Sequence, residues 1–225
     1  MAIGLSPMRF LPRLKDRLLD IIYPPICQSC GTMGFWLCDT CLMTVEEAVL
    51  TPEAPEGING VISCFAYSDP KVRTLTASYK YRSARAFEAA QVTLLTHWVQ
   101  QNSLPLWAFS ESAILIPILS PESRIATRGI NHTLRLAQTI KQSFGLPSPI
   151  VTLLGRLEHD KHNAELEHEE RAQNVAQTFC LLSAVPKHVI LIDDVLTTGA
   201  TLAEAARVLR EGGAEQVYAI TFARG

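Results

Sequence analysis

Four cysteines fall within a short stretch and form two Cys-x2-Cys pairs, Cys27 with Cys30 and Cys38 with Cys41. Each such turn lets two thiolates point at one metal, and two turns supply the four soft ligands of a tetrahedral zinc site. All four ligands are thiolates, so no open position is left for a substrate. The spacing therefore predicts one structural Zn²⁺. The alternatives are unligated core cysteines or a redox Cys-x2-Cys pair, and the redox pair would leave the second turn unexplained.

A second chemical pattern lies near the C-terminus, where the apolar run 189–192 leads directly into Asp193 and Asp194. Backbone N–H groups at the helix start expected near residue 201 favour a phosphate, and hydroxyls add further donors. The two carboxylates would reach vicinal hydroxyls of a sugar that carries this phosphate, or would hold Mg²⁺ indirectly through its waters. The residues that form this turn are Val195, Leu196, Thr197, Thr198, Gly199, Ala200 and Thr201.

Other interpretations of this acidic strand end are less favoured. A Walker-B strand also ends in acids, but the chain contains no G-x-x-x-x-G-K-[ST] segment, and it has no G-x-G-x-x-G segment for a dinucleotide. Thr201 could instead simply cap a helix beside two solvated aspartates. A plain cap does not require two acids and several small residues together, so the sequence favours a phosphosugar site.

Two further segments carry charges that could serve the same site. The loop after the apolar run 113–119 contains Arg124 and Arg128, whose guanidinium forks suit a pyrophosphate, although an ordinary solvated loop is the alternative. Residues 157–171 are densely charged and cannot pack as core, which suggests a lid over the site. A metal site in this segment is a weaker alternative, and the sequence assigns no role to its histidines. They are His159, His162 and His168.

Strand-like and helix-like segments alternate along most of the chain. Short apolar runs suited to buried strands are separated by segments with apolar residues at helical spacing. This alternation predicts an α/β fold with an open, mostly parallel sheet flanked by helices, and ligands of such sheets bind at the carboxyl ends of the strands. The predicted strands cover 61–67, 113–119, 178–182, 189–192 and 217–222, and the predicted helices cover 72–81, 84–101, 131–144 and 202–211.

The composition fits a small module followed by a larger folded domain. The chain has 225 residues, of which 48% are hydrophobic and 19% charged, with a net charge of −2. This balance excludes a globally basic protein that coats nucleic acid, and it leaves open whether a basic N-terminal face binds DNA, a protein or nothing. A turn-rich tract at 51–57 follows the cysteines. We expect an N-terminal helix and a four-cysteine, zinc-ribbon-like module over 1–55 and the larger domain over 56–225. The basic face comprises Arg9, Arg13, Lys15 and Arg17.

The sequence also bears on the compartment of the protein. No stretch approaches the ~20 consecutive apolar residues of a membrane span. The first twenty residues lack the uninterrupted apolar region of a signal peptide. We therefore expect a cytoplasmic protein with no membrane contact, where disulfides are rare, which favours a metal over disulfides at the cysteine pairs. Cys64 and Cys180 are interpreted as core residues.

The loop 193–201 resembles the phosphoribosyl-pyrophosphate (PRPP) motif of type I phosphoribosyltransferases, which pairs two acids with a Thr-Thr-Gly-x-Thr loop. The order of segments is similar to that of the ComF family, bacterial phosphoribosyltransferase-like proteins associated with competence for DNA uptake. The family's Arg-Gly-Phe-Asn-Gln reads differently here, with Ile130 and His132 in place of the aromatic residue and the Gln. Its Gln-x-Gly-Leu-Ser stretch is also replaced, at 162–167. The shared segments are the cysteine module at 18–41, the Val-Arg-x-Leu…Lys-Tyr segment at 72–81, the Pro-rich loop at 117–131, the Arg-x-x-Asn-Val stretch at 171–175 and the PRPP motif.

The resemblance implies a type I phosphoribosyltransferase-like fold and a reaction at the anomeric carbon of Mg²⁺·PRPP. A nitrogen acceptor would displace pyrophosphate from this carbon. Asp193 and Asp194 would hold the ribose hydroxyls, and residues 195–201 would grip the 5′-phosphate. Arg124 would offset the charge on the departing pyrophosphate.

Further residues enter through the same resemblance. Arg128 and Lys80 would also bind PRPP, while Arg171 and Asn174 would belong to the lid. The alternative is a non-catalytic PRPP- or nucleotide-sensing partner protein of the DNA-uptake machinery. An amidophosphoribosyltransferase is a weaker rival, because the zinc module stands where its glutaminase domain would be. The sequence identifies neither the acceptor nor the oligomeric state.

Overall fold

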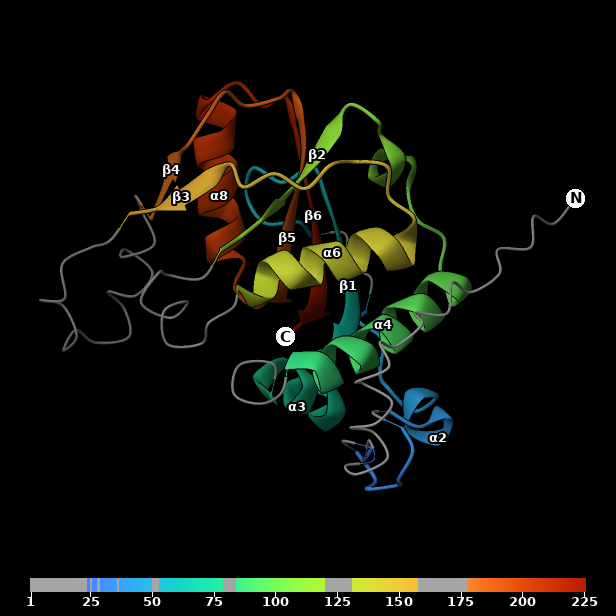
Figure 1. Ribbon diagram of the computed structural model, residues 1–225. Helices are drawn as coiled ribbons and strands as arrows, with labels where there is room; N and C mark the ends of the chain where they lie inside the picture. The colour runs from blue at the N-terminus through green and yellow to red at the C-terminus, as the bar shows by residue number, and fades with distance from the viewer. Residues whose placement is uncertain are drawn as a thin grey trace, which may run out of the picture.

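A four-stranded parallel sheet forms the centre of the molecule (Figure 1). The computed structural model describes residues 24, 26–27, 29–35, 37–49, 53–78, 84–119, 131–157 and 178–225. The strand order is β1-β6-β5-β2, and every neighbouring pair is parallel, which confirms the predicted open parallel sheet. The strands are β1 (Gly60–Ala66), β2 (Ala113–Pro117), β5 (His188–Leu196) and β6 (Gln216–Arg224).

Strand β5 lies inside the sheet and extends beyond the apolar run that predicted it. The side chains of residues 189–192 are all buried, as expected for a strand covered on both faces. The strand nevertheless continues to Leu196, because Asp193 and Val195 remain paired with Thr221 and Ala223 of β6. The two acids therefore belong to the end of the strand and not to the loop after it.

Helices cover the two faces of the sheet as two separate layers. Helices α3 (Pro70–Ser78), α4 (Ala84–Gln101) and α6 (His132–Phe144) contribute buried side chains to one hydrophobic cluster, together with alternate residues of the strands. Helix α8 (Ala200–Glu211) packs with the other set of strand residues. Figure 1 shows α4 and α6 together in front of the sheet, with α8 apart from them. This arrangement confirms the predicted flanking helices.

Helix α6 ends where the sequence predicts and begins one residue later than predicted, because Asn131 is its N-cap. The side chain of Asn131 accepts hydrogen bonds from the backbone N–H groups of Thr133 and Leu134, at 3.2 and 3.3 Å. At the other end Gly145 adopts a left-handed conformation with φ +65°. The capped first turn of α6 lies near the end of β5, where His132 approaches Asp194.

Several short elements were not predicted. β3 (Leu154–Arg156) and β4 (Phe179–Leu181) form a separate antiparallel pair, of which only β4 was expected. The 3-10 helix η1 (Leu106–Phe109) and the four-residue helix α2 (Asp39–Leu42) were also missed. Elements of three or four residues contain too few positions to display a hydrophobic period.

The segment that carries the cysteines packs against the larger domain. Glu47 forms an antiparallel bridge with Phe65, and Ala48 N–H donates to the Cys64 carbonyl, so this segment covers the outer edge of β1. Cys27, Leu37, Cys38 and Cys41 belong to the same hydrophobic cluster as α4 and α6. Among the described helices, none is both long and apolar enough to span a bilayer.

Candidate functional site

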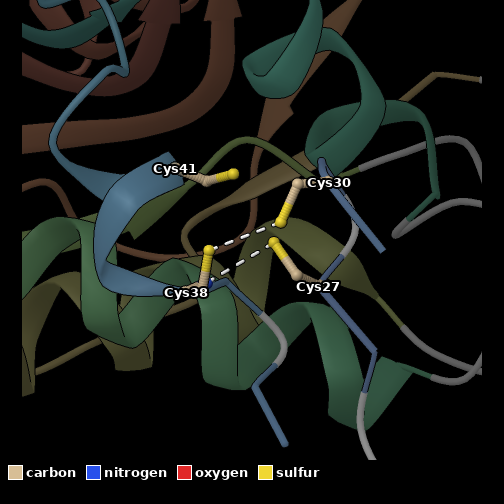
Figure 2. A group of neighbouring side chains, drawn as sticks. All are labelled: Cys27, Cys30, Cys38 and Cys41. Atoms are coloured by element: carbon tan, nitrogen blue, oxygen red, sulfur yellow. Dashed lines mark hydrogen bonds between the residues drawn. The ribbon is translucent and has the colours of Figure 1, made fainter. Parts of the chain in front are cut away.

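The four cysteines of the predicted zinc module come together around one point. Their Sγ atoms all lie within 4.8 Å of one another, and Figure 2 shows the side chains converging. Cys30 Sγ lies 3.5 Å from Cys38 Sγ, and the Cys38 N–H donates to Cys27 Sγ at 3.5 Å. All four are free thiols rather than disulfides. The donor set therefore fits a metal ion with four thiolate ligands.

Two different local structures hold the two cysteine pairs. The first pair sits on a small hairpin closed by the antiparallel bridge between Ile26 and Met33. The second pair sits at the start of helix α2, where Cys38 is the N-cap and Cys41 lies in the helix. Cys27, Cys38 and Cys41 are buried, whereas Cys30 is exposed. The site is thus closed on the side of the core and reaches solvent only at Cys30.

The thiols of this cluster do not ionise alike. The Thr32 side chain lies 3.1 Å from Cys30 Sγ, and its hydrogen bond, with that of the Thr32 backbone, lowers the pKa of Cys30 to about 6. A hydrogen bond to Ser29 lowers the pKa of Cys41, but burial and the neighbouring thiols outweigh it and raise that pKa to about 12. Four thiolates cannot accumulate here without a cation, so metal binding and deprotonation would be linked.

The acid pair lies at the carboxyl end of β5, before the turn that enters α8. Asp193 Oδ1 accepts the backbone N–H of Asp194 at 2.9 Å, and Asp194 Oδ1 accepts that of Val195 at 2.9 Å. Both acids are partly buried. Burial raises the pKa of Asp193 well above its usual range, the Asp194 carboxylate raises it further, and the charge of Arg156 acts in the opposite direction. Asp193 therefore resists carrying a negative charge.

The turn after the acids ends at the N-terminus of α8. Gly199 is the N-cap residue, with φ +79°, and Ala200 N–H donates to Thr198 Oγ1 at 3.4 Å. Thr197 and Thr198 are exposed, and Thr201 lies in the first helical turn. Free N–H groups and the positive end of the helix dipole at such a start suit an anion. The predicted order of strand, acids, turn and helix is confirmed.

Val195 and Leu196 contribute to the site differently from the threonines. Leu196 is only 3% exposed and belongs to the cluster between the sheet and α8, and Val195 packs against the cluster on the other face. Their side chains thus pack on the two faces of the strand end, and they are not exposed as Thr197 and Thr198 are.

Two neighbours of the acid pair come from remote parts of the chain and were not assigned to the site by their type and spacing. His132, at the start of α6, has its Nε2 atom 3.4 Å from Asp194 Oδ2. Arg156 of β3 lies over the Phe179 ring, 5.2 Å from its centroid, and its charge acts on Asp193. The one sequence signal for His132 was its departure from the ComF pattern. Arg156 gave no signal, because a lone arginine after a short apolar run is common.

The described part of the turn-rich tract, residues 53–57, also contacts this turn. A Cβ atom on Gly199 would lie 2.8 Å from Pro55 Cγ, so the two residues are in close contact. Arg224 donates to the Glu53 carbonyl at 3.3 Å, and Gly225 N–H donates to the Leu196 carbonyl at 2.9 Å. Residues 53–55 and the C-terminal end of β6 therefore support the turn from outside.

Several predicted site residues lie outside the described residues. They are Lys80, Arg124, Arg128, Arg171 and Asn174, and the same holds for His159, His162 and His168.

Comparisons with known proteins point to one class. A family model for the phosphoribosyl transferase domain matches residues 151–225. Competence protein F of Haemophilus influenzae is 32% identical over 116 residues, which cover 49% of this chain and 49% of that protein. A ribose-phosphate pyrophosphokinase of a Nostoc species is 40% identical over 62 residues, covering 27% of this chain and 19% of that protein. A solved hypoxanthine phosphoribosyltransferase from Staphylococcus aureus aligns with TM-score 0.37 and 13% identity, over 60% of this chain and 62% of that chain.

The family match and the similarity to competence protein F show what the C-terminal part of the chain resembles. Residues 151–225 match the phosphoribosyl transferase domain, and the match includes β5, the acid pair and α8, so this part of the chain is phosphoribosyltransferase-like. The chain is also a homologue of competence protein F across about half of the length of each protein, which confirms the resemblance to the ComF family. The aligned segments span about half, or less, of the curated relatives they match.

Proposed function

We propose that this protein binds Mg²⁺·PRPP at residues 193–201 and transfers the phosphoribosyl group to a nitrogen acceptor. The observation that carries the proposal is the passage from β5 through Asp193 and Asp194 into the turn at the N-terminus of α8. The phosphoribosyl transferase family match over 151–225 supports it, because the match contains this whole passage.

Each part of the passage has a role in this proposal. The Asp193 and Asp194 carboxylates accept hydrogen bonds from the ribose hydroxyls. The 5′-phosphate lies at the start of α8, where backbone N–H groups and the hydroxyls of Thr197, Thr198 and Thr201 can donate to it. Arg124, Arg128 and Lys80 bind the pyrophosphate, and Arg171 and Asn174 belong to the lid.

The reaction is a substitution at the anomeric carbon. The bond from this carbon to the pyrophosphate oxygen breaks, and pyrophosphate leaves with the electron pair. A bond to the acceptor nitrogen forms, and this nitrogen gives up a proton. Catalysis rests on positioning and charge stabilisation, to which Arg124 contributes as charge builds on pyrophosphate. Carboxylate oxygens suit Mg²⁺ held through waters, and the ion supplies positive charge to the diphosphate.

The cysteine cluster is proposed to hold a structural Zn²⁺. Four convergent thiols with no open position support a closed tetrahedral site. We further propose that the protein is cytoplasmic, that residues 1–55 and 56–225 are its two parts, and that it serves DNA uptake, as the name of its homologue suggests.

Calorimetry with Mg²⁺·PRPP tests the binding site. The double variant Asp193→Asn with Asp194→Asn should weaken binding by about 10²-fold or more, since hydrogen bonds to charged groups contribute about 1.5–3 kcal/mol each. The matched control is Glu211→Gln with Glu215→Gln, which removes the same charge at the far end of α8 and before β6. Equal affinities in the wild type and the Asp variant would contradict the assignment.

A PRPP- or nucleotide-sensing protein without turnover is the second candidate. The altered residues Ile130 and His132 support it, because they replace family residues just before α6 and at its first position. Pyrophosphate release, measured over a panel of bases, amines and nucleosides, separates the two candidates. In an enzyme, Arg124→Ala should lower kcat by about 10²–10³-fold and change KM less, since pyrophosphate gains charge as the bond breaks. In a sensor it changes affinity alone.

A further inference from the structure

His132 is placed against the acid pair by an element that is itself firmly held. It is the first residue of α6, directly after Asn131, whose side chain caps the helix through two backbone N–H groups. Further along the helix, Leu136, Ala137 and Ile140 are buried in the cluster against the sheet. The backbone at His132 therefore has little freedom, and its side chain meets Asp194 in a defined orientation.

The contact between His132 and Asp194 lies away from bulk solvent. His132 Nε2 is 3.4 Å from Asp194 Oδ2, and the two side chains are only 12% and 22% exposed. A polar contact with a carboxylate is worth more in such surroundings than on an open surface, where water and salt screen it. The contact is therefore placed where it can help to orient the carboxylate.

Both oxygens of Asp194 are engaged in the structure. Oδ1 accepts the backbone N–H of Val195 at 2.9 Å, and Oδ2 faces His132. A carboxylate held at both oxygens cannot rotate freely about its terminal bond, and a carboxylate oxygen can accept more than one hydrogen bond. Asp194 is thus preorganised, and the group that completes its support comes from another element.

We propose that His132 is a positioning residue for ribose recognition, which holds the Asp194 carboxylate ready to accept a hydrogen bond from a ribose hydroxyl. This inference rests on the proposed function, since it names the group that orients one of the two proposed ribose ligands. The 5′-phosphate is proposed to bind at residues 197–201, at the start of α8, and not at His132. The proposal therefore predicts an effect on ligands that contain ribose and none on a bare phosphate.

Calorimetry on the full chain tests the proposal with three probes, namely Mg²⁺·PRPP, ribose 5-phosphate and inorganic phosphate. His132→Ala should weaken binding of both ribose ligands about tenfold, as expected for one lost contact to a charged group. His132→Gln retains an N–H donor and should keep affinity within about threefold. Inorganic phosphate should bind all variants alike. His188→Ala is the matched control, because this histidine contacts Ser112 at the other end of β5.

A double-mutant cycle with Asp194→Asn distinguishes positioning from general damage. If His132 acts through Asp194, His132→Ala should cause no further loss in the Asp194→Asn background. Independent, additive losses would overturn the proposal, and so would wild-type affinity of His132→Ala for the ribose ligands. An equal loss of inorganic phosphate binding would indicate a structural role and would also overturn it.

The outcomes for the wild type separate this proposal from the proposed function. If the wild type binds ribose 5-phosphate but not Mg²⁺·PRPP, the proposed function fails and the cycle on ribose 5-phosphate still decides the role of His132. If the wild type binds neither ribose ligand, both proposals are contradicted. If it binds PRPP and His132→Ala does so equally well, only the positioning role fails.

Discussion

The cysteine cluster (Cys27, Cys30, Cys38 and Cys41) and the acid turn (residues 193–201) bring polar groups together in opposite ways. The four Sγ atoms lie within 4.8 Å of one another, and all four come from the segment 27–41. The acid turn is also continuous in sequence, but its neighbours come from α6, β3 and the tract 53–55. A cluster that depends on local chain can be predicted from spacing, whereas a site surrounded by remote elements cannot be predicted as a whole.

The two regions also differ in which group can compensate their negative charges. Three of the four cysteines are buried, and thiols that crowd one another need a cation before all can ionise. At the acid turn burial raises the pKa of Asp193, while nearby Arg156 acts to lower it. The four thiols of the cysteine cluster thus need a cation in order to ionise together, while the acid turn has a protein group, Arg156, that balances part of its charge.

The largest expected effect is loss of the metal from the cysteine cluster. Cys41→Ser should abolish zinc binding, which contributes about 10–16 kcal/mol in zinc-finger peptides at neutral pH. Because Cys27, Cys38 and Cys41 share a cluster with α4 and α6, the whole chain should unfold at a lower temperature in one transition. Metal analysis and thermal unfolding measure both effects.

Cys180→Ser is the control for the cysteine change. This residue is partly buried on β4, outside the cluster, so zinc content should stay at one ion per chain. If Cys41→Ser retains zinc, the four cysteines are not the zinc site. If zinc-free protein keeps the wild-type melting temperature, a metal at the cysteine cluster does not stabilise the fold. Either result contradicts the contrast between the two regions.

The second effect concerns the contact between Pro55 and the acid turn. Gly199→Ala places a Cβ atom 2.8 Å from Pro55 Cγ at a φ of +79°, so the turn or the tract must move. Backbone strain of this type costs about 1–3 kcal/mol, and inorganic phosphate should bind more weakly because the turn shifts. Denaturant unfolding and calorimetry with phosphate measure the two consequences.

Gly145→Ala separates strain from the contact with Pro55. Gly145 has a similar φ of +65° at the end of α6, but a Cβ atom there meets no atom within 4 Å. Gly145→Ala should lower the free energy of unfolding by about 1 kcal/mol and leave the affinity for inorganic phosphate unchanged. Equal losses for the two variants would mean that Pro55 does not support the turn.

The same contrast explains which features could be predicted from the sequence. Helix α4 coincides with the predicted range 84–101, because eighteen residues display the helical spacing of apolar side chains over several turns. Strand β3 was missed, because three residues display no period. The order of acids and turn was predicted for 193–201. The contacts of His132 and Pro55 with it were not, because they depend on how remote elements pack.

The third prediction concerns how the cysteine segment is attached to the domain. Asp69 is 2% exposed; burial raises its pKa, but the N–H groups of Glu46 and Lys71 and the charge of Lys71 outweigh this and hold the pKa below its usual range. The folded protein therefore favours the ionised form. Asp69→Asn should destabilise the protein by about 1–3 kcal/mol at neutral pH, since it loses hydrogen bonds to a charged acceptor.

The pH dependence of the Asp69 effect has a definite sign. The stabilisation from this carboxylate is present above its unfolded pKa of about 3.9 and is lost as pH falls through the lower pKa of the folded state. Denaturant unfolding from pH 7 to pH 3 should therefore show the wild type and Asp69→Asn converging toward acid. A difference that stays constant over this range would contradict the role of the charge.

The smallest effect should have the opposite sign. Asp193 has a raised pKa because of burial and the adjacent Asp194 carboxylate, so the folded state binds its proton more tightly than the unfolded chain. Its contribution to stability is fully present below about pH 3.9 and is lost as pH rises through the folded pKa. At neutral pH the wild type bears this cost, and Asp193→Asn does not. Without added Mg²⁺ or PRPP, the variant should thus be more stable than the wild type at pH 7 and equal to it near pH 3. A variant that is less stable at pH 7 would mean that Arg156 and the turn already compensate the charge fully, and the acid turn would then resemble Asp69 rather than differ from it.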